Sequence, residues 1–157
     1  MGKITSESTA RKLIKQNISI LITGSFDVVH LGHLRLLQKA KTVVKGNGIL
    51  IIALLDDQTI RLRKGSNRPI FDINYRLEFL SYLKPVDYVF AWKKPWQELR
   101  NFVLKTHPSY LAIVEGDPGF ANKKELITKA GGKLVIIKKQ GNFSTTKIIN
   151  FLKIPEK

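Results

Sequence analysis

Five short apolar runs recur along the chain, and segments with helical spacing separate each run from the next. The runs occupy residues 18–23, 49–55, 86–92, 110–114 and 133–137. The second of them, ILIIALL, is too short for an isolated helix and too apolar for an exposed strand. It therefore indicates a strand that is buried on both faces, as in a parallel sheet.

The segments between the runs carry apolar residues at helical spacing, for example at positions 31, 34, 37, 40 and 44. We expect helices over residues 5–16, 31–44, 73–83, 95–106, 122–130 and 144–152. Alternation of strands and helices predicts an α/β, Rossmann-like fold, with an open parallel five-stranded sheet and helices on both faces. Without a linker or repeat, residues 1–157 are expected to form a single domain with a short leading helix at about 5–16.

The amino-acid composition of the chain limits the kinds of molecule that it is expected to bind. The chain has no cysteine, which excludes disulfides and thiolate metal sites, and the seven-residue run at 49–55 falls far short of the roughly 20 residues that span a bilayer. We expect a cytoplasmic protein without membrane contact. The net charge of +15 attracts anions, but the only dense basic cluster, at 61–68, lacks interleaved aromatics. A phosphorylated small molecule is therefore favoured over nucleic acid.

Residues suited to phosphate binding follow the predicted strands. Because parallel strands end at one edge of a sheet, the segments after them are expected to meet there. These segments are rich in glycine, basic residues and hydroxyls, and they span residues 24–33, 56–69, 93–96, 115–120 and 139–146. The sequence therefore predicts a site for a phosphorylated nucleotide at this edge.

The first of these segments, GSFDVVHLGH, holds two of the three histidines. His30 and His33 are three residues apart at a predicted helix start, so they share a face where the helix dipole favours an anion. Two other interpretations remain open at this point. One histidine caps the helix while the other is buried, or the two bind zinc, which the absence of cysteine disfavours.

The full segment resembles the HxGH nucleotidylyltransferase superfamily, the cytidylyltransferase-like proteins, whose members often carry GxFDxxHxGH after the first strand. The matching residues are Gly24, Phe26, Asp27, His30, Gly32 and His33. Two further motifs follow in the expected order. Lys64 and Arg68 match a KGxxRP loop that precedes a characteristic arginine, Arg76, and FSTT at 143–146 matches an ISTT motif.

The resemblance implies roles for these residues. His30 and His33 would act on the α-phosphate, while Lys64 and Arg76 would hold phosphates from a mobile loop and its neighbouring helix. The nucleotide would also be contacted by Gly24, Ser25, Phe26, Gly32, Asp117, Ser144, Thr145 and Thr146. Mg²⁺ is expected through the nucleotide phosphates, without a dedicated protein site. Each late motif has a plainer interpretation: a solvated basic loop at 61–68, an N-cap at Ser144, or an ion pair of Arg76 within its own helix.

Within the superfamily, the chain is most similar to the heptose 1-phosphate adenylyltransferase domain of bacterial ADP-heptose synthesis, which implies ATP and a sugar 1-phosphate as substrates. One departure is VEGD at 114–117, where that family has KGGD, so that Glu115 replaces a glycine. The alternatives are a CTP-dependent cytidylyltransferase of the glycerol-3-phosphate type, an FMN adenylyltransferase, and a basic RNA-binding module without catalysis. The resemblance also implies a homodimer.

Overall fold

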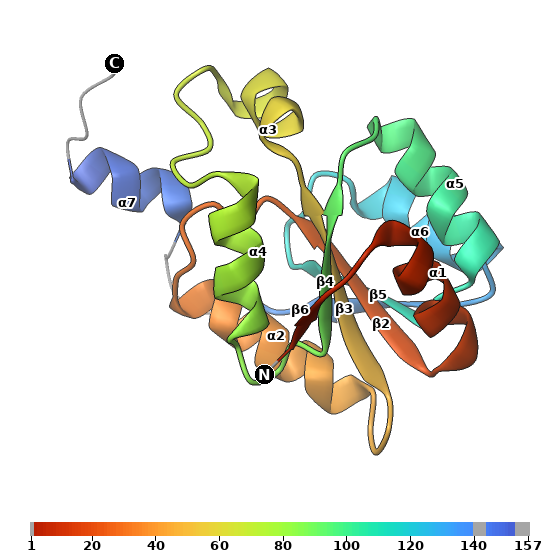
Figure 1. The fold of residues 1–157 in the computed structure, drawn as a ribbon. Coiled ribbons are helices and arrows are strands. Elements are labelled where there is room, and N and C mark those ends of the chain that lie inside the picture. The colour runs from red at the N-terminus through yellow and green to blue at the C-terminus, as the bar shows by residue number, and fades with distance from the viewer. Residues whose placement is uncertain (1, 140–143, 153–157) are drawn as a thin grey trace.

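The computed structural model describes residues 2–139 and 144–152, and its centre is a parallel sheet with strand order β1-β4-β3-β2-β5-β6 (Figure 1). The predicted α/β class and parallel sheet are confirmed, with six strands in place of five. The additional strand pairs with the β4 edge and has only two residues, too few for an apolar run. The strands are β1 (Lys3–Ile4), β2 (Ser19–Gly24), β3 (Ile49–Leu55), β4 (Tyr88–Trp92), β5 (Tyr110–Val114) and β6 (Lys133–Ile137).

Six of the helices occupy the segments whose spacing predicts them. They are α1 (Glu7–Gln16), α2 (Leu31–Val43), α4 (Ile73–Ser81), α5 (Trp96–Thr106), α6 (Phe120–Lys129) and α7 (Thr145–Phe151). None of the helices in the described ranges is both long enough and apolar enough to cross a membrane.

The segment after β3 corrects an expectation. Residues Asp57–Lys64 form helix α3, where a loop was predicted. The Asp56 side chain caps this helix by accepting from the amide of Thr59, and Ile60 is its buried residue. A single buried apolar residue produces no helical periodicity, so the pattern of the sequence could not reveal α3. Lys64 consequently lies at the C-terminal end of a helix.

The helices form one layer on each face of the sheet. Helices α1, α5 and α6 cover one face, and α2 and α4 cover the other (Figure 1). Strand β3 shows why, since Ile51, Ala53 and Leu55 pack into the first layer while Leu50, Ile52 and Leu54 pack into the second. All seven residues of β3 are buried, which explains its uninterrupted apolar sequence.

Strand β2 lies at the point where the strand order reverses. Its neighbours are β3 on one side and β5 on the other. From β3 the chain continues to β4 toward one edge of the sheet, and from β5 it continues to β6 at the other edge. A parallel sheet opens a crevice at the carboxyl end of such a strand. The segment with the two histidines follows β2 and enters this crevice.

Candidate active site

His30 and His33 together form the N-terminal cap of α2. The amide of Gly32 donates to Nδ1 of His30 at 3.1 Å, and the amide of His30 donates to Nδ1 of His33 at 3.4 Å. This is a capping box built from two imidazoles. Because each Nδ1 accepts a hydrogen bond, the neutral ring carries its hydrogen on Nε2. The capping interpretation is thus correct, and it assigns the ring hydrogen of each neutral imidazole to Nε2.

The surroundings keep these rings neutral. Burial, together with the nearby His30 and Lys64, lowers the pKa of His33 to about 4. Burial also lowers the pKa of His30 below its ordinary value. The ring centroids are 4.0 Å apart, and Phe26 packs 5.0 Å from His33. Phe26 reaches this position with a φ of +44°, in the left-handed region that few non-glycine residues adopt.

Both rings line a cleft of about 270 Å³ between the start of α2, the end of β6 and the start of α7. Ser144, Thr145 and Thr146 line the same cleft, so the structure brings together the first and last sequence motifs. The Thr145 hydroxyl donates to the carbonyl of Val28 at 3.2 Å, which ties α7 to the segment before His30. Ser144 caps α7 by accepting from the amide of Lys147 at 3.1 Å.

Three cations in this cleft were missed from the sequence. Arg35 belongs to the second turn of α2, and Lys138 and Lys139 follow β6 directly. The signal was present, since two lysines at the carboxyl end of the last strand lie at the same sheet edge as the histidines. The predicted segment 139–146 already includes Lys139, but roles were assigned only to the residues of the matched motifs.

A second cleft, of about 640 Å³, adjoins the first at Lys64, which lines both. Its other lining residues come from the ends of β2 and β3, from α3, from the start of α6 and from the turn before it: Thr23, Gly24, Ser25, Leu55, Ile60, Arg63, Asp117, Pro118, Gly119, Asn122 and Lys123. Lys64 donates to the Ser25 hydroxyl at 2.9 Å. Partial burial, together with repulsion from Arg68, lowers the pKa of Lys64. An anion between the two clefts would relieve that repulsion.

Arg76 occupies a different place from the one expected. Its side chain is buried, and it donates to the carbonyls of Ser25, Leu55 and Phe71 at 2.6, 2.9 and 2.9 Å. It also pairs with Asp57 of α3 at 2.5 Å. The guanidinium therefore joins the carboxyl ends of β2 and β3 to α3 and α4. Arg76 is not among the residues that line either cleft, and its ion-pair partner lies on α3 and not within its own helix. Its contact with phosphate stays a prediction.

The two site aspartates are held by the protein. Buried Asp27 accepts from Arg68 Nε and from the amides of Ile70 and Phe71 at 2.5, 2.7 and 3.2 Å. Asp117 accepts from the amide of Gly119 and from Lys123, both at 2.7 Å. Within residues 2–139 and 144–152, no three histidine or acidic side chains are grouped to hold a metal ion. Binding of Mg²⁺ through the nucleotide phosphates stays a prediction.

Glu115 lies at the sheet edge outside both clefts. Its amide donates to the carbonyl of Ile137 at 2.9 Å, and the residue is exposed. Glu115, the departure from the family motif, is therefore not among the residues that line either cleft.

A parallel α/β sheet with a polar crevice at its switch point is an architecture that binds nucleotides in many proteins. Residues 21–151 match the cytidylyltransferase-like family model, and the chain belongs to this family of nucleotidyltransferases. The bifunctional protein HldE of Desulfatibacillum aliphaticivorans is 29% identical over 145 residues, or 91% of this chain. The HldE protein of Helicobacter hepaticus is 33% identical over 136 residues, or 85% of this chain.

The chain spans only 29% and 26% of the length of these two relatives. A solved structure, the lipopolysaccharide core biosynthesis protein from Thermoplasma volcanium GSS1, aligns over 81% of this chain and 99% of its own. Its TM-score is 0.62 and its sequence identity is 26%.

Proposed function

We propose that the chain is an adenylyltransferase that transfers AMP from ATP to a sugar 1-phosphate such as heptose 1-phosphate, with release of pyrophosphate. The observation that carries the proposal is the cleft between α2 and α7. Two neutral imidazoles, the hydroxyls of 144–146 and four cations line it. The four cations, Arg35, Lys64, Lys138 and Lys139, form no ion pair with any residue that the structure describes.

The choice of adenylyl transfer to a sugar phosphate is supported by the resemblance of the motifs and by the relatives. Two HldE proteins and a lipopolysaccharide core biosynthesis protein align with most of the chain. The adjoining larger cleft has room for the parts of ATP and of the sugar phosphate that lie away from the reacting phosphates. Its lining includes Asn122 and the Asp117–Lys123 pair, whose polar side chains are suited to hydroxyl groups.

The proposed reaction is an in-line displacement. An oxygen of the acceptor phosphate forms a bond with the α-phosphorus of ATP, and the bond from that phosphorus to the β-phosphate oxygen breaks, so that pyrophosphate leaves. A phosphomonoester has its second pKa near 6 and is already a nucleophile at neutral pH, so no general base is required. Catalysis then consists of positioning and of stabilising charge on the phosphoryl oxygens.

The residues divide this work between them. His30 and His33 donate their Nε2 hydrogens to α-phosphate oxygens and stay neutral, since burial disfavours their charged forms. Lys64 lies where the clefts meet and is placed to contact both reacting phosphates. Lys138, Lys139 and the 144–146 segment hold the β- and γ-phosphates. Mg²⁺, when bound with ATP, would neutralise part of the charge on the triphosphate.

The decisive experiment measures pyrophosphate release with Mg²⁺, with ATP or CTP against heptose 1-phosphate, glycerol 3-phosphate and FMN. We expect release only with ATP and heptose 1-phosphate. A His30→Ala/His33→Ala variant, checked for folding by circular dichroism, controls for contaminating enzymes. Activity with CTP and glycerol 3-phosphate, or with ATP and FMN, would refute the proposed substrates. Silence with every pair, together with RNA binding that weakens steeply with salt, would identify a binding module.

A further inference from the structure

Three consecutive residues, Ser25, Phe26 and Asp27, follow strand β2 and lead toward the histidine pair. The Ser25 hydroxyl accepts from the ammonium group of Lys64 at 2.9 Å. The buried ring of Phe26 lies 5.0 Å from the ring of His33. The Asp27 side chain is fully buried and lines neither of the two clefts described above. This short segment therefore contacts both Lys64 and His33, which the proposed function places on the reacting phosphates.

Asp27 binds the loop that joins α3 to α4, residues 65–71. Oδ2 of Asp27 accepts from Nε of Arg68 at 2.5 Å. Oδ1 accepts from the amides of Ile70 and Phe71 at 2.7 and 3.2 Å. Hydrogen bonds to an ionised carboxylate are stronger than those between neutral groups. One buried carboxylate therefore holds the far end of this loop against the segment after β2.

Lys64 lies at the near end of the same loop. Its ammonium group donates to Ser25, two residues before Asp27, so both ends of the loop are attached to one short segment. Phe26 lies between the two attachments and has a φ of +44°, in the left-handed region. A non-glycine residue stays in this conformation only when its surroundings hold it there. The position of Lys64 relative to His33 thus depends on the attachment at Asp27.

The charges around Lys64 give Asp27 a second effect. Burial lowers the pKa of Lys64, and so does repulsion from three cations, which are Arg68 of the loop, Arg63 of α3 and Arg76 of α4. The negative charge of Asp27 acts in the opposite direction and raises this pKa. The imidazole nearby stays neutral and adds no charge at neutral pH. Asp27 thus favours the charged form of the ammonium group whose loop it holds.

We propose that Asp27 is a positioning residue, which anchors the loop 65–71 on the segment after β2 and thereby holds Lys64 on the reacting phosphates beside the two imidazoles. The proposal rests on the proposed function, because that function assigns Lys64 its contact with those phosphates. Asp27 touches neither reactant and acts through the placement of Lys64. Placement matters in an in-line displacement, since a small error in the position of a reacting or stabilising group costs much of the rate.

A double-mutant cycle tests whether Asp27 acts through Lys64. Asp27→Asn keeps the shape of the side chain and an oxygen for the loop amides, but it removes the charge. It is expected to lower kcat/KM for pyrophosphate release, measured per folded molecule, about 10- to 100-fold. In a Lys64→Met background the same substitution is expected to change kcat/KM about twofold at most. Equal effects in the two backgrounds would overturn the proposal.

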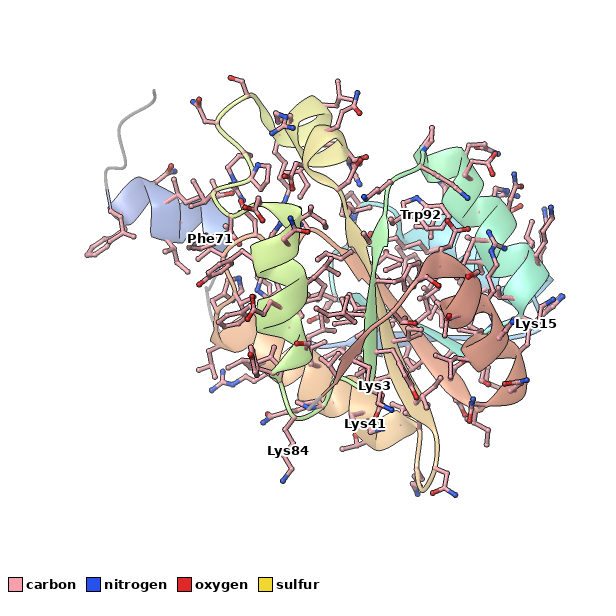
Figure 2. The ribbon with its side chains drawn as sticks, in the orientation of Figure 1. Lys3, Lys15, Lys41, Phe71, Lys84 and Trp92 are labelled. Atoms are coloured by element: carbon pink, nitrogen blue, oxygen red, sulfur yellow. The ribbon has the colours of Figure 1, made fainter. Side chains whose placement is uncertain are left out.

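Asp87→Asn is the matched control for a purely structural role. Asp87 also accepts from a cation and from an amide, those of Lys41 at 2.5 Å and Leu50 at 2.6 Å. These bonds lie where β3 and β4 begin, at the end of the sheet opposite to the clefts, and Figure 2 shows Lys41 well apart from Phe71. The control is expected to lose stability and to keep its kcat/KM. An equal loss of kcat/KM in Asp87→Asn and Asp27→Asn would overturn the proposal.

A titration without any reactant separates this proposal from the proposed function. NMR of the full chain, labelled at the ε-carbon of lysine, follows the signal that Lys64→Met lacks. Asp27→Asn is expected to lower the pKa of Lys64, because it removes an attracting charge, and Arg68→Met is expected to raise it, because it removes a repelling one. A loop that detaches in both variants would expose Lys64 and raise its pKa in both. Shifts of the same sign, or no shift, would overturn the proposal.

The two measurements fail in different ways. If no pair of reactants gives turnover, the proposed function fails, and the titration still decides whether Asp27 acts on Lys64. If Asp27→Asn does not fold, Arg68→Met takes its place in the cycle, because it removes the same ion pair from the side of the loop. Its loss of kcat/KM is then expected to disappear in the Lys64→Met background, and a loss that persists there would overturn the proposal.

Discussion

Replacing Arg76 by methionine separates a structural role from a catalytic one. The resemblance predicts that Arg76 binds phosphate, whereas the structure buries its guanidinium between Asp57 and the carbonyls of Ser25, Leu55 and Phe71. If the structural role is correct, Arg76→Met reduces the free energy of unfolding severely. Loss of turnover in the variant would then follow from displacement of the strand ends.

The magnitude follows from the partners that remain. Removing one member of a buried ion pair costs about 3 to 5 kcal/mol, because the other charge is left without compensation. The Asp57 side chain is 22% exposed, so water recovers part of its solvation and the lower end of that range applies. The carbonyls that lose their donor add to the cost. We expect a loss of about 3 kcal/mol, a large part of the 5 to 15 kcal/mol that is typical of a domain.

Urea denaturation followed by circular dichroism measures this loss. Arg76→Met/Asp57→Asn is expected to recover part of the stability, since it removes the unpaired carboxylate. Lys129→Met is the matched control, because the pair of Lys129 with Glu125 is more than half exposed on both sides and water screens it. An Arg76→Met chain that unfolds like the wild type but releases no pyrophosphate would refute the structural role and restore the predicted phosphate contact.

Three further predictions concern the cleft. His33→Ala should lower kcat at least 100-fold and cost about 1 kcal/mol through the lost cap, whereas His33→Gln, with a good residue for this capping position, should recover the Tm but not the turnover. Recovery of both would assign His33 a purely structural role. Stability should fall as the pH falls from 6.5 toward 4, because the unfolded His33 ring gains a proton that the folded ring, with a pKa of about 4, does not bind. The loss from this residue is about 3 kcal/mol, and urea midpoints of His33→Gln should lack it; an unchanged pH profile would contradict the assignment. Lys138→Ala/Lys139→Ala should weaken pyrophosphate binding at least tenfold in calorimetry, while Lys133→Ala, exposed on β6, should leave it within about twofold. Equal effects would show that only net charge matters.

The secondary structure was largely predictable because burial of one face of a helix or strand makes apolar residues repeat at a fixed spacing in the sequence. Strand β3 is apolar throughout since both faces are covered, and α2 repeats its apolar residues since one side packs on the sheet. The sequence did not predict helix α3 or strand β1, because each is too short or too exposed to produce a repeating pattern of apolar residues. Helix α3 depends on its cap at Asp56, an interaction that a periodicity cannot register.

The sequence by itself determined the class of fold and the types of residue that gather at the edge of the sheet. The alternation of elements requires a parallel sheet, and such a sheet gathers the ends of its strands, so the histidines and the 144–146 segment had to lie close together. The tertiary structure decided which groups face the cleft. It placed Lys138 and Lys139 at the cleft and buried Arg76 beneath the strand ends. It also fixed the imidazole tautomers through the cap of α2. The physical reason is that a residue's type sets what it can bind, whereas its free donors depend on hydrogen bonds to residues distant in the chain. For Arg76 these partners lie as far back as Ser25, and no local pattern records them.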